Sequence, residues 1–382
     1  MKKLVCFTAY LIAAAMLLPL CACTQATGET ETEAQTATDM TQTETQPETT
    51  AEQESGKISP EEGETVSLLS ELMTEWSIHY KRSSLDDIFD YTERCEPVPV
   101  HFSWSGEADY SHLLISVSPD MSDAEVYLCS GNELDVEDLL PGTEYFWQTA
   151  VTKDGVTARS DIHSFKTLQT VRTVYIPGVS NVRDIGGKTT FDGKRVKYNM
   201  AFRGADFAKL TDEGVKKAVD VLGIKTELDL REKVVNGTSP LGKDVKYISV
   251  TAPYYGLVNN ASYKDALLTE LRAFADPDNF PIYFHCSLGR DRTGTLAYIL
   301  LTLLGADEND IYMDYETSFF SDMGGYVDNA APSVSLSNLD NLRSIVSTKK
   351  NRYEHTRKYL IKLGMTDEEL DAIRANLLED VK

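Results

Sequence analysis

The pattern of hydrophobic and polar residues changes several times along the chain and divides it into segments. Residues 24–64 consist almost entirely of Thr, Glu, Gln, Ala and Ser, without the periodicity that forms a core. Such a segment buries too little apolar area to offset the entropy lost on ordering, so we expect a disordered acidic linker. Over residues 65–95 apolar positions recur at helical spacing, which predicts one or two short helices.

Residues 96–168 switch to short segments in which apolar and polar residues alternate. A period of two places successive side chains on opposite faces of a strand, and turn residues separate the segments at the spacing of a β-sandwich. We therefore predict a small all-β domain here. Its strands are expected at Val98–Trp104, Leu113–Val117, Glu125–Cys129, Glu144–Thr152 and Ile162–Lys166.

From residue 169 to residue 382, short β-prone runs alternate with helical runs. This order predicts an α/β domain with a central, mostly parallel sheet and helices on both faces. Strands are expected at Arg172–Ile176, Lys225–Leu230, Val245–Val250 and Ile282–His285. Helices are expected from the cap Thr211 to about Leu222 and at Ser262–Ala275, Thr293–Leu304, Asp307–Phe320, Leu336–Thr348, Arg352–Leu363 and Asp367–Glu379, the last with a capping box at Thr366.

Residues 1–23 have the pattern of a secretion signal, in which Lys2 and Lys3 form a charged start and an apolar run extends from Leu4 to Leu20. The following residues, Leu20-Cys21-Ala22-Cys23, resemble a bacterial lipobox, whose last cysteine becomes the acylated N-terminus. This resemblance implies an extracytoplasmic protein that is lipid-anchored to the bacterial cell membrane through Cys23. The alternatives are an ordinary cleaved signal and an uncleaved membrane anchor.

Length, charge and cysteine count limit the remaining possibilities. A chain of 382 residues is long enough for two or three domains, and a formal net charge of −23 argues against nucleic-acid binding. Of the six cysteines, Cys6 and Cys21 lie in the predicted signal. Cys95 and Cys129 would both lie outside the cytoplasm, where they either form a disulfide or remain two buried thiols.

The stretch from His285 to Gly294, HCSLGRDRTG, carries the candidate chemistry. A β-prone run leads into it and a helical run follows it, so the predicted geometry is a strand, a tight loop and a helix N-terminus. The backbone N–H groups of such a loop, together with the start of the helix, bind a tetrahedral anion. Arg292 can close this cradle around two phosphate oxygens, and the positive field lowers the pKa of Cys286 to yield a thiolate nucleophile. The Thr293 hydroxyl can donate to the sulfur or to the leaving phosphate.

This stretch resembles the signature of the cysteine-dependent, tyrosine-type phosphatases, which is His-Cys, five residues, Arg, then Ser or Thr. Three further stretches, Asn181–Gly187, Phe202–Asp206 and Glu227–Glu232, are similar to bacterial members that also act on phosphoserine, phosphothreonine and phosphoinositides. The resemblance implies a phosphocysteine intermediate, with substrate held by the loop residues Ser287, Leu288, Gly289 and Arg290. The alternative is a buried cysteine before a helix, with a surface arginine.

The proton donor for the leaving group has several candidates. Ordinary tyrosine phosphatases carry an acidic residue on a loop upstream of the nucleophile, but the matching region here, Ala252–Leu257, has no carboxylate. Asp291, inside the loop, is the first candidate, with a purely structural role as its alternative. Asp184, Asp206 and Asp229 are weaker candidates.

Four polar residues near the loop have open roles. Arg290 stands where the family usually has Lys, and it either supplies a second cation for substrates with several phosphates or pairs with the neighbouring Asp291. Arg183 and Asp184 either bind substrate and orient the cradle or hold the glycine turn after them. His285 is expected to be a satisfied polar residue behind the loop. We expect no metal or cofactor, because no second His or Cys cluster lies nearby and phosphocysteine chemistry needs none.

Within the predicted β domain, Leu139–Tyr145 resembles the tyrosine corner of fibronectin type III domains, and Trp104 fits their buried tryptophan. The resemblance implies a spacer or docking module, or a module that binds a glycan or a protein.

The sequence as a whole predicts a phosphomonoester hydrolase, most simply a protein-tyrosine or dual-specificity phosphatase. A phosphoinositide or inositol-polyphosphate phosphatase is the alternative within the same chemistry. A surface protein that only binds phosphorylated ligands is the alternative of another class. The expected partners are phosphorylated protein, lipid or inositol substrates and the membrane, but no nucleic acid.

Overall fold

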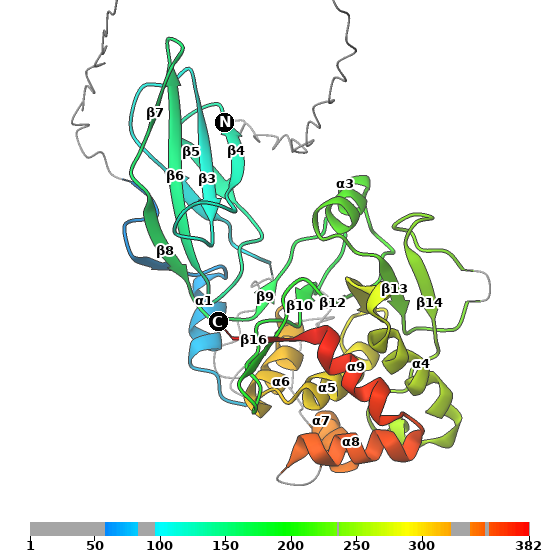
Figure 1. The fold of residues 1–382 in the computed structure, drawn as a ribbon. Coiled ribbons are helices and arrows are strands. Elements are labelled where there is room, and N and C mark those ends of the chain that lie inside the picture. Colours follow the sequence, from blue (N-terminus) through cyan, green and yellow to red (C-terminus); the bar gives the residue numbers. More distant parts are fainter. Residues whose placement is uncertain (1–57, 83–95, 235–236, 322–336, 348–350, 382) are drawn as a thin grey trace, which may run out of the picture.

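The computed structural model describes residues 58–82, 96–234, 237–321, 337–347 and 351–381. Figure 1 shows a β domain above an α/β domain, with the first helix lying between them. The predicted signal, most of the predicted linker and Cys95 lie outside the described residues. Within the described part, no helix is both long enough and apolar enough to cross a membrane.

The β domain contains two sheets that share one apolar core. The larger sheet has the order β1-β8-β6-β3-β4, with β7 paired to β6, and the smaller sheet pairs β2 with β5. Phe102 of β2 packs edge-on against Trp147 of β6 and Phe165 of β8, with ring centroids 5.4 and 5.5 Å apart. The strands are β1 (Glu64–Val66), β2 (Val100–Ser103), β3 (Tyr110–Ser116), β4 (Glu125–Cys129), β5 (Glu133–Val136), β6 (Glu144–Lys153), β7 (Val156–Arg159) and β8 (His163–Thr167).

Five of these strands confirm the predicted alternation to within a few residues, whereas β1, β5 and β7 were not predicted. The predicted boundary between linker and helix is wrong, because Glu64–Val66 is a strand that pairs in parallel with β8. Three residues are too few for a period to show. The helix begins only at α1 (Glu71–Ile78), whose cap Ser70 accepts a hydrogen bond from the Met73 N–H.

The α/β domain is built on a six-stranded sheet, and the predicted class is confirmed. Its order is β14 (Lys246–Ser249), β13 (Thr226–Asp229), β15 (Ile282–His285), β12 (Ala201–Gly204), β10 (Arg183–Asp184) and β9 (Arg172–Thr173). The first four strands run parallel, and β10 and β9 are antiparallel to their neighbours. Ile282 and Phe284 face one apolar cluster and Tyr283 faces another, so helices cover both faces as expected.

The helices follow the predicted order with adjusted ends. The first is α3 (Asp212–Lys216), which continues as the π-helical turn η1 (Lys217–Val221), and its cap Thr211 is confirmed. The last predicted helix is too long, because Leu378–Asp380 forms a strand, β16, that pairs with β11 (Lys194–Val196). The others are η2 (Tyr255–Asn259), η3 (Ala261–Tyr263), α4 (Lys264–Ala275), η4 (Pro277–Asn279), α5 (Asp291–Leu304), α6 (Glu308–Glu316), η5 (Thr317–Phe320), α7 (Ser337–Val346), α8 (Arg352–Leu363) and α9 (Asp367–Leu377), the last with the predicted capping box.

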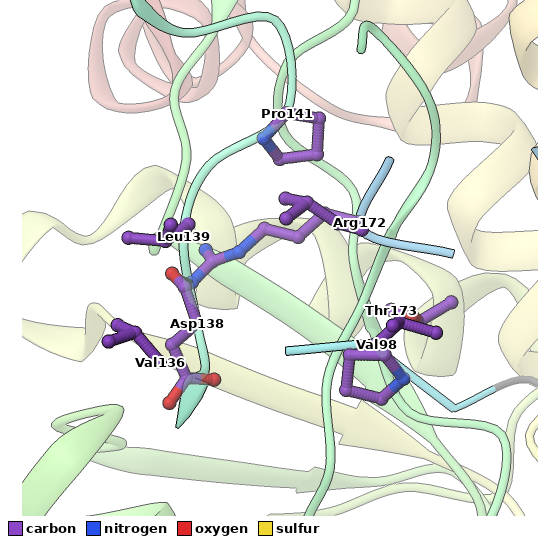
Figure 2. A pocket seen from close by; sticks show the side chains of 9 residues that line it. Val98, Val136, Asp138, Leu139, Pro141, Arg172 and Thr173 are labelled. Carbon is purple, nitrogen blue, oxygen red and sulfur yellow. Dashed lines mark hydrogen bonds between the residues drawn. The ribbon is translucent and has the colours of Figure 1, made fainter. Parts of the chain in front are cut away.

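Direct contacts join the two domains. Arg172 of β9 donates to the Asp138 carbonyl oxygen at 3.3 Å, and Lys217 forms an ion pair with the Asp138 carboxylate. A narrow pocket lies at this junction, with Val136 and Leu139 on one side and Arg172 on the other (Figure 2). The β domain is therefore held against the sheet edge farthest from β14.

Candidate active site

The candidate nucleophile lies at the carboxyl end of the buried strand β15. All four residues of β15 are buried, and Cys286 follows directly. After four intervening residues the chain enters α5, which begins at Asp291 and is buried from Thr293 to Leu304. The strand and the helix are both anchored in the core, so the loop between them has little freedom. The predicted geometry of strand, tight loop and helix N-terminus is confirmed.

The carbonyl groups of the loop are held by donors that lie outside it. The Asp206 N–H donates to the Ser287 oxygen at 3.3 Å, and the Asn181 side-chain amide donates to the Leu288 oxygen at 2.9 Å. Arg203 Nη2 donates to the Gly289 oxygen, also at 2.9 Å. With three successive carbonyls engaged outside, the N–H groups of the loop are left to line its concave side, as in an anion-binding nest.

Gly289 is the position where the loop needs glycine. Its φ is +70°, and a Cβ atom placed there would lie 2.3 Å from the carbonyl oxygen of Gly204. A side chain would therefore meet both left-handed strain and a backbone clash. The close approach of the loop to β12 also brings the Gly289 oxygen within reach of Arg203.

The Cys286 thiol is 3% exposed, and its pKa is shifted by opposing effects. Burial alone raises the pKa, but hydrogen bonds from the Thr293 side chain and from the Thr293 and Leu288 amides, together with the charge of Arg292, bring it below its usual value. The Thr293 hydroxyl is itself buried and makes no well-formed hydrogen bond to another group among the described residues, so its proton is available to the sulfur. A thiolate is thus favoured where the loop amides converge.

Arg292 reaches across the carboxyl end of the sheet. Its Nη1 donates to the Leu230 and Arg231 carbonyl oxygens, at 3.2 and 2.5 Å, at the end of the neighbouring strand β13. Within the part of the chain that the structure describes, Nε and Nη2 of the planar guanidinium group make no hydrogen bond, so they are available to an anion. This arrangement matches the two-point binding of a phosphate by arginine.

A buried ionic cluster supports the loop from below. Asp314 of α6 pairs with Arg183 at 3.3 Å and closely with Arg203, and all three residues are almost wholly buried. Burial alone would raise the pKa of Asp314, yet the two arginines lower it to about 2. Arg183 also donates to the Asn181 side chain at 2.6 Å. The cluster thus holds in place both Arg203 and Asn181, the side chains that donate hydrogen bonds to two of the loop carbonyl oxygens.

This cluster corrects the assignment of Arg183 and Asp184 as substrate-binding residues. They are 0% and 1% exposed, so neither side chain can reach a bound substrate. Successive strand residues point to opposite faces, and the two side chains have different partners. Asp184 accepts from the Gly186 and Asn199 amides and pairs with Arg172 at 2.8 Å, which holds the glycine turn as the alternative reading expected.

His285 is confirmed as a satisfied residue behind the loop. Its Nε2 lies 2.9 Å from Glu227 Oε1, and its Nδ1 donates to the Cys286 carbonyl oxygen at 3.2 Å. Glu227, Asp229 and His285 offer ligand atoms within 4.8 Å of one another, the spacing a metal ion would need. Asp229, however, already accepts four hydrogen bonds from Arg231 and Tyr247. Hydrogen bonding therefore accounts for Asp229, for His285 and for Oε1 of Glu227, whereas Glu227 Oε2 is buried without a hydrogen-bond partner among the described residues.

Asp291 stands at the first position of α5, with 35% of its side chain exposed. Its Oδ1 accepts from Tyr255 at 2.5 Å and from Arg290 Nε at 3.1 Å. Arg290 is thus paired with Asp291, which was one of the two roles expected for it. The two weaker acid candidates on this side, Asp206 and Asp229, both form ion pairs with Arg231 at 2.9 Å.

Sequence reasoning missed the roles of several residues around the loop. They are Asn181, whose amide donates to the Leu288 carbonyl oxygen, and Asp314, Glu227 and Tyr255. Asn181 has a φ of +61°, a left-handed conformation that asparagine tolerates better than most residues. The Asn-x-Arg order gave a weak local signal for it. Asp314 lies in an acidic helix more than a hundred residues away from Arg203, and nothing in the surrounding sequence distinguishes it.

Two sequence comparisons find known proteins that are similar to part of this chain. A family model described as "Tyrosine phosphatase family" matches residues 174–379, more than half of the chain. A protein of Cupriavidus necator, provisionally named a tyrosine-protein phosphatase, is 25% identical over 166 residues, covering 36% of this chain and 59% of that relative. This chain therefore spans somewhat more than half the length of that curated relative.

Two solved structures resemble part of the chain. The core catalytic domain of the PP-IP phosphatase Siw14 from S. cerevisiae, in complex with citrate, is 16% identical, with a TM-score of 0.29, covering 46% of this chain and 94% of that one. A second structure of the Siw14 catalytic core is also 16% identical, with a TM-score of 0.25, and covers 41% and 93%.

Proposed function

This chain belongs to the tyrosine phosphatase family, and from that premise we propose that it hydrolyses phosphomonoesters through a phosphocysteine intermediate. The observation that carries the proposal is the cradle itself. Cys286, whose pKa lies below its usual value, stands where the loop amides converge, and the carbonyls of the loop are held outward by donors outside it. A thiolate at the base of an anion site is placed for attack on phosphorus.

In the proposed reaction the Cys286 thiolate attacks phosphorus while the bond from phosphorus to the leaving oxygen breaks. The leaving oxygen takes a proton from Asp291. The loop amides and Arg292 stabilise the charge on the three equatorial oxygens of the transition state. Water then attacks the phosphocysteine and gives a proton back to Asp291, and the sulfur–phosphorus bond breaks to release phosphate and the thiolate.

The direct test is Cys286→Ser with para-nitrophenyl phosphate as substrate. The serine hydroxyl stays protonated at neutral pH, so phosphate release is expected to stop while the folded structure and phosphate binding persist. Cys129→Ser, the same chemical change in the β domain, serves as a matched control and should keep its activity. Undiminished phosphate release by Cys286→Ser would refute the proposal. An unmutated protein that holds a phosphopeptide without turnover would instead favour the binding-protein alternative.

For the substrate, we propose a protein phosphotyrosine or phosphoserine rather than an inositol polyphosphate. The charge of Arg231 is met by Asp206 and Asp229, and Arg290 is held against Asp291 by a hydrogen bond from its Nε. Cations that are already paired attract extra phosphate groups less strongly. The test is phosphate release from a phosphotyrosine peptide, a phosphoserine peptide, a phosphoinositide and an inositol polyphosphate at equal concentrations. Preference for the inositol polyphosphate would reverse the assignment.

We also propose that residues 96–168, together with β1, form a fibronectin type III-like spacer next to the catalytic domain at 169–382. The support is the Tyr145 hydroxyl, which accepts a hydrogen bond from the Leu140 N–H at 2.7 Å, as in a tyrosine corner. Trp104 is buried in the same core.

The location is proposed from the sequence alone. The charged start, the apolar run and the Leu-Cys-Ala-Cys motif support lipid attachment at Cys23 on the extracytoplasmic side of a bacterial membrane. Expression of the chain in bacteria fed labelled palmitate should label the unmutated protein and leave Cys23→Ala unlabelled. Equal labelling of both would refute the lipid site.

A further inference from the structure

Tyr255 lies in the segment that lacks the upstream carboxylate, and it is held more tightly than a surface loop requires. Its side chain is buried, and its φ is +41° at the start of η2, a strained conformation for a bulky residue. The Tyr255 N–H donates to Thr295 Oγ1 at 3.0 Å, and that hydroxyl donates to the Asp291 carbonyl oxygen at 2.9 Å. Backbone strain of this kind persists where surrounding contacts over-determine it, which occurs most often at functional sites.

The Tyr255 hydroxyl connects this segment to the catalytic loop. It donates its only proton to Asp291 Oδ1 at 2.5 Å, since a carboxylate oxygen can only accept. The hydroxyl of Tyr315, 2.8 Å from that of Tyr255, must therefore donate to Tyr255. The result is a chain of hydrogen bonds that runs from α6 through η2 to the first residue of α5.

These contacts distinguish the two oxygens of Asp291. Oδ1 accepts from Tyr255 at 2.5 Å and from Arg290 Nε at 3.1 Å, whereas Oδ2 accepts only one long hydrogen bond from the described residues, from Arg290 Nη2 at 3.5 Å. With two donors at Oδ1, a proton on the carboxyl group belongs on Oδ2. The side chain is part-exposed, so Oδ2 is the oxygen that can exchange a proton with a bound substrate.

We propose that Tyr255 is a positioning residue that fixes the Asp291 carboxyl group, so that Oδ2 gives its proton to the leaving oxygen and later takes one from the attacking water. This inference rests on the proposed phosphatase function. In the first step the Oδ2–H bond breaks as the leaving oxygen separates from phosphorus. In the second step Oδ2 removes a proton from water as the new oxygen–phosphorus bond forms. The segment without a carboxylate thus holds the acid instead of supplying it.

The test compares Tyr255→Phe with the unmutated protein on two substrates. Para-nitrophenyl phosphate has a good leaving group that needs little protonation, whereas a phosphoserine peptide has a poor one that depends on the acid. Misplacing the carboxyl group should lower kcat on phosphoserine by about tenfold or more, part of the usual contribution of a general acid, with a much smaller loss on para-nitrophenyl phosphate and little change in KM. If the unmutated protein does not turn over phosphoserine, phenyl phosphate replaces it as the poorer leaving group.

Tyr298→Phe is the matched control. Tyr298 is also a buried tyrosine, and its hydroxyl lies 2.7 Å from Ser347 Oγ and does not hydrogen-bond to Asp291. The control should change kcat only slightly, and by the same factor on both substrates. In a double-mutant cycle, Tyr255→Phe should lower kcat on phosphoserine little further once Asp291→Asn is present, because both changes remove the same proton transfer.

Equal losses on both substrates, or no loss on either, would overturn the positioning role while leaving the proposed function intact. An unmutated protein without phosphatase activity would instead refute the proposed function itself. Should Tyr255→Phe fail to fold, as judged by circular dichroism, Tyr315→Phe takes its place. That variant keeps the Tyr255–Asp291 bond and removes its supporting donor, so a smaller loss confined to the poor leaving group is expected, and an even loss would count against the role.

Discussion

The cores of the β domain and the catalytic domain differ in what they bury. Among described residues of the β strands, the buried polar groups are uncharged Ser and Thr side chains, and the rest of the core is apolar and aromatic. The catalytic domain buries many charged side chains in addition to its apolar clusters. They are Arg172, Arg183, Asp184, Lys188, Arg203, Glu227, Asp229, Glu270, Asp314 and Glu316, together with His285.

In the β domain the buried residues stabilise the fold alone, whereas in the catalytic domain some of them also fix the conformation of the loop after Cys286. A buried charge costs several kcal/mol of desolvation, which well-packed apolar residues avoid. In the catalytic domain part of this cost serves the loop, because Arg203 donates to the Gly289 oxygen, His285 donates to the Cys286 oxygen, and Arg183 holds Asn181, which donates to the Leu288 oxygen. Glu270 of α4 is an exception. Its burial raises the pKa of its carboxyl group well above the usual range, and nothing in the structure explains why this residue is buried.

The largest expected effect comes from Asp314→Asn. The change leaves Arg183 and Arg203 buried without their counter-charge, so unfolding should become easier by about 3–5 kcal/mol and turnover should be lost. Urea denaturation measures the free energy of unfolding, and para-nitrophenyl phosphate hydrolysis measures turnover. Asp161→Asn, at an exposed position in the β domain, should change neither. A loss of less than about 1 kcal/mol for Asp314→Asn would show that the buried cluster is not needed.

Acidification should distinguish the two domains next most strongly. The pKa of Asp314 is lowered to about 2 from an ordinary 3.8, so its stabilising effect is complete above pH 3.8 and is lost as the pH falls towards 2. The linked stability is about 2 kcal/mol. Hydrogen exchange with mass spectrometry, which resolves the domains, should show protection falling in the catalytic domain before the β domain. Parallel losses in both would contradict the contrast.

Thr293→Val should weaken the thiolate without removing the nucleophile. The hydroxyl that lowers the pKa of Cys286 is lost, so the thiol should stay protonated to higher pH, and alkylation by iodoacetamide at slightly acid pH should slow several-fold. Mass spectrometry of the Cys286 peptide gives the rate. Thr293→Ser keeps the hydroxyl and should behave like the unmutated protein. An unchanged pH profile in Thr293→Val would assign the shift to the amides and Arg292 alone.

In the β domain, Phe102→Leu should reduce stability without reducing activity. The residue is fully buried among Trp147 and Phe165, so a smaller side chain should cost about 1 kcal/mol. The kcat/KM for para-nitrophenyl phosphate should stay within about twofold, because the apolar core does not contact the loop. A large loss of activity with intact catalytic-domain protection would show that the domains are coupled more closely than their contacts indicate.

The smallest effect is expected at the junction between the domains. Lys217→Met removes the ion pair with Asp138 and Glu137 but keeps the length of the side chain. Pairs with a part-exposed partner contribute about 0–1 kcal/mol, so thermal unfolding should shift only slightly, and less in high salt. A strong destabilisation would mean that the junction organises the catalytic domain.

Much of the site could be predicted locally, because its parts are adjacent in sequence. Strand, loop, nucleophile and helix lie within Ile282–Leu304, and short-range preferences are enough to recognise them. The supports of the loop were missed for the opposite reason. Asp314 is 111 residues from Arg203 and Asn181 is 107 residues from Leu288, and no local pattern encodes a contact over such a separation. The same limit applies to β1, which is recognisable only by its pairing with β8.

The sequence by itself determined the chemistry of this protein: a cysteine and an arginine spaced around a glycine loop, between a β-prone run and a helix. Side-chain identity and local backbone preference are properties of neighbouring residues, so they can be read directly. Only the tertiary structure decided which way the loop carbonyls point, that Arg183 and Asp184 are buried rather than substrate-facing, and that Tyr255 reaches Asp291. Those features depend on the burial of charges and on long-range hydrogen bonds, which exist only once the chain has packed.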